Sequence, residues 1–158
     1  MPDAPFDLKT AHRWFAVECN NEAWALLEDE DRTDPETERM IHVAHTALYH
    51  WSQVGTALNR FRALYLLAKV YVDAGEPEGA LHWADAALET GEDLDDATDF
   101  DLLCAQASAV EALMLVGEDE EAAALREEAR AAYAVIEDEE EREVLAKFFS
   151  EVLSEPVA

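Results

Sequence analysis

Basic residues are scarce in this chain of 158 residues: 11 lysines and arginines stand against 37 aspartates and glutamates, a formal net charge of −26 at pH 7. Proteins that bind nucleic acid need clustered cations to displace counterions from phosphates, so this charge excludes a phosphate-backbone binder. The same charge disfavours docking on an anionic membrane surface. The acidity indicates either a solvated surface suited to high ionic strength, which screens self-repulsion, or a basic partner.

Glycine, proline and cysteine are also rare, with five, five and two copies, and this composition excludes collagen-like, low-complexity and disulfide-stabilised chains. Cys19 and Cys104 have no base or cation beside them in the sequence, which indicates small buried side chains in a reducing compartment. No apolar stretch approaches the roughly 18 residues of a membrane span. The first residues lack the basic and then apolar order of a signal peptide. The sequence therefore predicts a cytoplasmic protein.

No alternating run of β-branched residues indicates a strand, whereas half of the residues are hydrophobic and alanine is abundant. Seven helical segments joined by short connections predict antiparallel neighbours. Asp34 and Pro35 are expected to be the N-cap and the first residue of the second helix. We expect one all-α domain over residues 1–158, with helix pairs at about 7–54, 57–90 and 97–136 and a capping helix at about 139–153.

An internal repeat indicates how the helices pair. The segment GEPEGA that begins at Gly75 recurs 42 residues later as GEDEEA at Gly117, and the residues around each glycine keep the same spacing. The matched positions are Leu67, Ala68, Tyr71, Gly75, Ala80, Ala84 and Ala87 in the first copy, and Ala109, Val110, Leu113, Gly117, Ala122, Arg126 and Ala129 in the second.

This pattern resembles the tetratricopeptide repeat, in which small residues let two antiparallel helices approach and a glycine makes the turn. Tyr71 and Ala80 occupy signature positions of that motif, whereas Leu64 replaces its tryptophan and Ala84 its second aromatic residue. The closing proline is missing. The resemblance covers about residues 61–130. It implies a right-handed stack of antiparallel helix pairs, about seven helices in all, in which the first helix of each pair lines a concave groove.

Cations in the middle of the chain gather on the third helix. Arg62 and Lys69 are seven residues apart and share a helix face with Tyr65 and Asp73. The resemblance places this face in the groove, opposite Glu111 of the fifth helix. We expect Arg62 and Lys69 to attract a carboxylate of a peptide or protein partner while Tyr65 stacks on it. Asp73 and Glu111 would select against extended acidic ligands.

The same cations have a second interpretation, as halves of ion pairs that hold adjacent helices together. Lys69 would then pair with Glu111, and Arg62 with Asp99 or Asp101. The two interpretations are compatible if a ligand displaces an internal carboxylate.

A metal site is the alternative function. Glu38, His42 and His45 follow one stripe of the second helix at spacings of four and three residues. A glutamate and two histidines in that pattern are suitable ligands for zinc or non-haem iron, in a small metal-binding protein or metalloenzyme. The apolar residues of this helix lie on the opposite side, however, so the stripe is expected to face solvent or a groove edge.

Motifs of catalysis are missing, including a phosphate-cradling glycine loop, a nucleophile elbow and a HExxH pair. We therefore expect a scaffold without catalysis or cofactor, whose partner is a protein or peptide bound through a carboxylate or a basic surface. Residues 44–71 also look similar to uncharacterised bacterial helical-repeat proteins, a resemblance that implies no reaction. The outer side of the first helix, with Trp14 and Trp24, would allow a homodimer. Phe148 and Phe149 are expected to cap the end of the stack.

Overall fold

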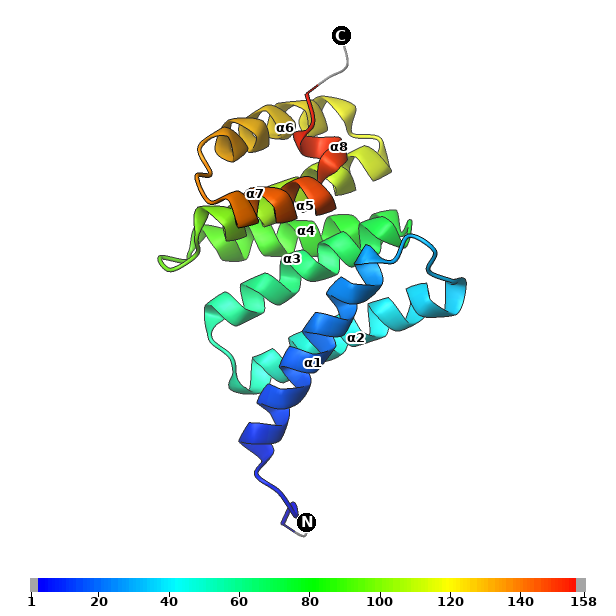
Figure 1. Ribbon diagram of the computed structural model, residues 1–158, viewed down its shortest axis with the longest axis vertical. Helices are drawn as coiled ribbons and strands as arrows, with labels where there is room; N and C mark the ends of the chain where they lie inside the picture. Colours follow the sequence, from blue (N-terminus) through cyan, green and yellow to red (C-terminus); the bar gives the residue numbers. More distant parts are fainter. Residues whose placement is uncertain (1–2, 156–158) are drawn as a thin grey trace.

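The computed structural model describes residues 3–155, and within this range it contains eight helices and no strand (Figure 1). The all-α fold predicted from the sequence is confirmed. The helices are α1 (Leu8–Glu28), α2 (Asp34–Val54), α3 (Ala57–Asp73), α4 (Pro77–Glu92), α5 (Asp99–Val116), α6 (Asp119–Ala134), α7 (Glu139–Phe148) and α8 (Ser150–Leu153).

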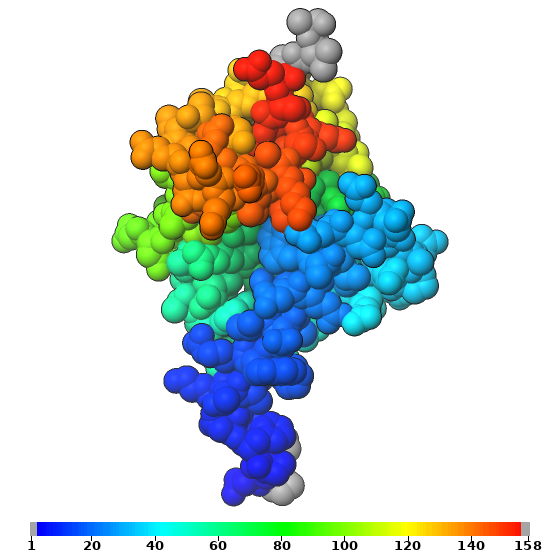
Figure 2. Space-filling view, in the orientation of Figure 1, coloured from blue at the N-terminus to red at the C-terminus, as the bar shows by residue number. Residues whose placement is uncertain are grey.

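Consecutive helices pack against one another in antiparallel pairs, α1 with α2, α3 with α4 and α5 with α6 (Figure 1). Helix α3 also packs against α5, so these two helices form the middle of the stack. The buried cluster between α3, α4 and α5 is rich in alanine, which has no side chain beyond Cβ and lets the helices approach closely. Its buried residues are Ala68, Ala80, Ala84, Ala109 and Ala112. The start of α1 projects beyond the other helices (Figure 2).

The two glycines of the repeat make equivalent turns. Gly75 and Gly117 have φ angles of 71° and 86°, a left-handed conformation that is strained for any residue with a Cβ. In each copy the amide after the glycine donates to a carbonyl oxygen in the last turn of the preceding helix, that of Tyr71 at 3.0 Å and that of Leu113 at 2.9 Å. These are the bonds of a Schellman motif. The sequence repeat therefore corresponds to a repeated turn.

The start of α2 differs by one residue from the prediction. Thr33, not Asp34, is the N-cap, and Pro35 is the second residue of the helix. The carboxylate of Glu36 accepts a hydrogen bond from the Thr33 amide at 2.8 Å. A threonine followed three residues later by a glutamate forms a capping box, and this reciprocal arrangement outweighs the preference of aspartate for the N-cap.

The segment expected as one capping helix at 139–153 is two helices. Phe149 has φ −127° and ψ 34°, which interrupts the helix and lets α8 turn away from α7. Its ring is buried, as are Leu145, Val152 and Leu153 around it. The segment also does more than cover the end of the stack, because α7 crosses in front of α5 while α8 contacts both α5 and α6 (Figure 1). Burial of Phe149 explains the break.

Candidate functional site

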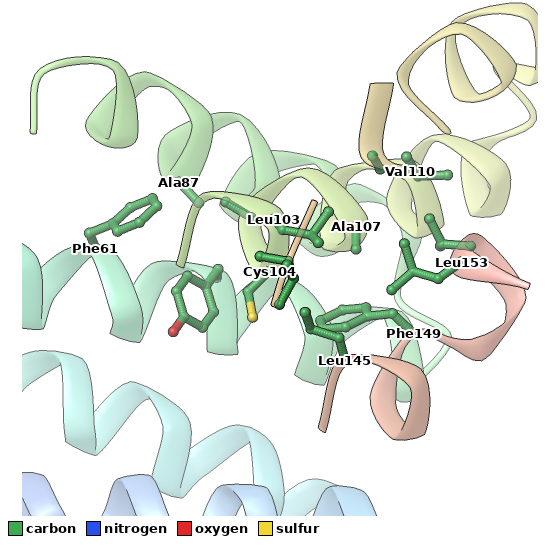
Figure 3. Close-up of a cluster of buried hydrophobic side chains, with 14 residues drawn as sticks. Phe61, Ala87, Leu103, Cys104, Ala107, Val110, Leu145, Phe149 and Leu153 are labelled. Carbon is green, nitrogen blue, oxygen red and sulfur yellow. The ribbon is translucent and has the colours of Figure 1, made fainter. Parts of the chain in front are cut away.

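The C-terminal segment covers most of the face between α3 and α5 that the sequence predicts as an open groove. Leu145 and Phe149 pack in one cluster with Tyr65 of α3 and Cys104 of α5 (Figure 3). On the other side, the ring of Trp24 in α1 meets that of Phe148 with centroids 4.8 Å apart. The covered face is apolar, and burying it is favourable. Tyr65, expected to stack on a ligand, therefore lies in the core and is 5% exposed.

Asp101 sits at the buried end of this face, where it is 1% exposed. Arg62 donates to both of its carboxylate oxygens, from Nε at 2.9 Å and from Nη2 at 3.0 Å, and the Tyr65 hydroxyl donates at 3.1 Å. The amide and hydroxyl of Thr98 donate to it as well, at 3.2 and 3.0 Å. Burial alone would raise the pKa of Asp101, but the hydrogen bonds from Arg62 and Thr98 bring it below the ordinary value.

Lys69 forms a second buried pair about two turns farther along α3. Its Nζ donates to the two carboxylate oxygens of Glu111 at 3.0 and 2.9 Å and lies 3.0 Å from Oδ1 of Asp73. The ammonium also lies 5.2 Å from the ring centroid of Phe149. Burial would lower the pKa of Lys69, but the carboxylates of Glu111 and Asp73 outweigh burial and raise it. The lysine therefore stays charged.

Glu111 is buried and shares the Lys69 ammonium with Asp73. Asp73 also lies 3.7 Å from a guanidinium nitrogen of Arg32. Burial raises the pKa of Glu111 to about 7, and the attraction of Lys69 only partly opposes this. The two upward shifts have different causes: the carboxylates of Glu111 and Asp73 raise the pKa of Lys69, whereas burial, with a smaller contribution from the Asp73 charge, raises the pKa of Glu111.

The internal ion pairs considered as the second interpretation of the sequence are both present. Lys69 pairs with Glu111 as expected, and Arg62 pairs with Asp101 rather than Asp99. The structure thereby separates the predicted site residues. It brings Lys69, Asp73 and Glu111 together and leaves Arg62 beside Asp101.

Lys69, Asp73 and Glu111 line an open cleft of about 440 Å³ at the end of the α3–α5 face. Helix α8 and the end of α7 form its other wall. The sequence predicts Phe148 and Phe149 as a cap on the end of the stack and not as part of this site, although apolar side chains at Leu145, Phe149 and Val152 have the spacing of a helix face that needs a partner. The cleft is lined by Lys69, Val72, Asp73, Glu111, Met114, Leu115, Phe148, Ser150 and Glu151.

The histidine stripe of α2 does not converge on a metal site. His42 lies 3.8 Å from Glu38 on the surface, with the side chains 73% and 76% exposed. His45 instead points inward, where its Nε2 is hydrogen-bonded to the Tyr71 hydroxyl at 2.9 Å. Among residues 3–155 no group of three or more histidine, cysteine or acidic side chains is arranged to hold a metal ion.

The cysteines agree in part with the expectation of buried thiols. Cys104 is buried and Cys19 is half-buried, and neither forms a disulfide. Burial raises the pKa of the Cys104 thiol far above its usual range. This thiol is therefore protonated and a poor nucleophile at neutral pH.

Titration of Glu111 is expected to make the fold less stable as the pH rises from about 4.5 to about 7. The pKa is near 7 in the folded chain and near 4.5 in the unfolded chain, so within this window the folded state holds a proton that the unfolded state has released. The free energy of unfolding then falls as the pH rises.

The reference for this measurement is Glu111→Gln, which mimics the protonated carboxyl and does not titrate. Urea denaturation across the window should show wild type losing on the order of 1–3 kcal/mol relative to the variant. Parallel pH profiles for the two proteins would contradict the assignment of the raised pKa to Glu111.

Within the part of the chain that the structure describes, no helix combines the length and the apolar character needed to cross a membrane. No family model, curated protein or solved structure matches the sequence.

Proposed function

We propose that this chain is a scaffold of tetratricopeptide-like helix pairs that binds a protein or peptide without catalysis, and that the cleft over Lys69 and Glu111 holds a segment of the partner. The observation that supports the proposal is the combination of charge and apolar surface in this cleft. The buried ion pair of Lys69 and Glu111 forms its floor, and the apolar side chains of Met114 and Leu115 line it as well. Concave sites with apolar walls and a few placed charges are the usual form of a recognition site.

The charges of the cleft favour a basic residue of the partner over a carboxylate. The lining carries three carboxylates, those of Asp73, Glu111 and Glu151, against the cation Lys69. Even with Arg32, which lies 3.7 Å from Asp73, the carboxylates outnumber the cations. A ligand carboxylate would have to displace Glu111 from its bidentate contact, which would leave that group buried and unpaired. A lysine or arginine head group instead finds oxygen acceptors, and the net charge of −26 draws a cationic partner toward the protein.

Apolar side chains around the cleft suit the stem of such a residue. Met114 and Leu115 are 37% and 40% exposed. The methylene groups of a lysine or arginine pack well on such surfaces while the charged head stays among polar groups. We therefore infer a partner segment with a basic residue next to an apolar one.

Selection from a phage-displayed library of random peptides on the immobilised protein tests this proposal. The peptides recovered should share a lysine or arginine beside an apolar residue. Their affinity should fall at least tenfold in Glu151→Lys, because the substitution places a second cation at the rim of the cleft, and a tenfold change corresponds to about 1.4 kcal/mol.

The matched control is Glu143→Lys, an equally drastic change of an exposed glutamate on α7 that does not line the cleft. It should bind the selected peptides as wild type does. Selection of acidic peptides, or equal loss in both variants, would contradict the proposal. Circular dichroism establishes that both variants are folded.

A further inference from the structure

The projecting start of α1 carries an aromatic surface that no other part of the described chain covers. Phe6, Leu8, Trp14 and Phe15 are between 45% and 60% exposed. Phe6, Trp14 and Phe15 also line a shallow apolar hollow of about 450 Å³. We refer to residues 6–15 as the α1 arm, which forms the deep blue projection in Figure 2.

The α1 arm is held against α2 by a cluster of rings. The Nδ1 atoms of His12 and His50 lie 2.7 Å apart, so one imidazole donates a hydrogen bond to the other. Phe15 stacks on His50 with centroids 5.4 Å apart, and the Arg13 guanidinium lies 5.8 Å from the ring of Trp51. These contacts hold α1 in a defined position against α2, so the exposed rings of Phe6 and Trp14 lie on an ordered helix.

The charge of the α1 arm is opposite to that of the rest of the chain. Residues 6–15 contain Lys9 and Arg13 against one carboxylate, Asp7, so the arm is net positive in a protein with 37 acidic residues. A partner surface for the arm must therefore be apolar and bordered by acidic groups.

Such a surface exists on the same chain, in a cleft of about 540 Å³ between α4, α5 and α6. Its apolar wall includes Leu102, which is 38% exposed, and two exposed glutamates also line it. We refer to it as the α4–α6 cleft. It is lined by Phe61, Leu88, Leu94, Leu102 and Leu125, with Glu92 and Glu128 as its acidic residues.

We propose that the α1 arm of one molecule docks in the α4–α6 cleft of a second copy of the chain. The aromatic rings would fill the apolar cleft, and Lys9 and Arg13 would approach the carboxylates of Glu92 and Glu128. Two arms packed on each other would instead bring four cations of the same sign together, so charge favours the arm-to-cleft arrangement. Each such contact is heterologous, and repetition generates a ring or an open chain of molecules.

Analytical ultracentrifugation of three variants tests this interface. Trp14→Glu places a carboxylate on the apolar surface of the α1 arm, and Leu102→Glu places one in the apolar wall of the α4–α6 cleft. Each substitution is expected to weaken self-association at least tenfold. Trp14 is 58% and Leu102 38% exposed, and circular dichroism establishes that both variants are folded. Val135→Glu is the matched control, because Val135 is 70% exposed and lies outside both surfaces. It should associate as wild type does.

A mixture of Trp14→Glu and Leu102→Glu gives the decisive result. Each molecule keeps the surface that the other lacks, so the mixture should form a dimer with one intact contact and stop at that size. A wild-type chain that stays monomeric overturns the proposal. The proposal is also overturned if Leu102→Glu associates as wild type does while Trp14→Glu does not. That result would indicate that two arms pack against each other. The cleft over Lys69 takes no part, so peptide binding there is expected to survive in both variants.

Discussion

Replacing Asp101 by alanine is expected to lower the free energy of unfolding by about 2–3 kcal/mol, chiefly through the lost helix cap and the unsatisfied Tyr65 hydroxyl. The carboxylate is almost completely buried and accepts hydrogen bonds from Arg62, Tyr65 and Thr98. Its removal leaves the Arg62 charge without its partner and the Tyr65 hydroxyl without its acceptor. It also removes one half of the capping box at the start of α5. A loss of this size is a large fraction of the stability of a single domain.

Chemical denaturation monitored by circular dichroism measures this loss, with Asp99→Ala as the control. Asp99 is also in the first turn of α5, but its side chain is exposed and contributes mainly through the helix dipole. The control should cost less than about 1 kcal/mol. Equal losses in the two variants would show that Asp101 acts only as a charge at a helix start.

Lys69→Met is expected to lower the free energy of unfolding by about 3–5 kcal/mol above about pH 7, where Glu111 of wild type is ionised. The substitution removes the cation paired with Glu111, while Asp73 keeps Arg32 at 3.7 Å. The loss should be smaller below about pH 7, because Glu111 is then protonated and places no unpaired charge in the core.

A double-mutant cycle separates the pair from its surroundings. Adding Glu111→Leu to Lys69→Met replaces both ends of the ion pair by apolar groups, which is often neutral for stability or better. The double variant should therefore be more stable than Lys69→Met alone, with a coupling of about 2–3 kcal/mol. Simple addition of the two single losses would contradict a direct pair.

Most helix positions could be predicted from local patterns, because glycine turns and threonine caps act through neighbouring residues. The equivalence of Gly75 and Gly117 was visible in the sequence and is a repeated turn in the structure. Asp101 was one of two candidates for Arg62. Its position three residues after Thr98 could have decided the choice, since a capping box turns that side chain toward the helix start.

The packing position of the C-terminal segment could not be predicted from local patterns. The apolar pattern of residues 145–153 shows that a face must be buried, but it does not say whether the segment covers the end or the side of the stack. That choice depends on Phe149, which breaks the helix to reach the cluster around Cys104. As a result Tyr65 belongs to the core, and the predicted groove is reduced to the cleft over Lys69.

Binding of a basic segment in this cleft can be observed residue by residue in a nuclear magnetic resonance titration. The probe is a short peptide of alternating lysine and leucine added to the isotope-labelled protein, and the control peptide has glutamate in place of lysine. Chemical-shift changes are expected to concentrate at Val72, Met114, Leu115 and Ser150, to appear with the lysine peptide only and to be lost in Glu151→Lys. Changes spread over the acidic surface, or equal changes with the glutamate peptide, would contradict the proposed binding.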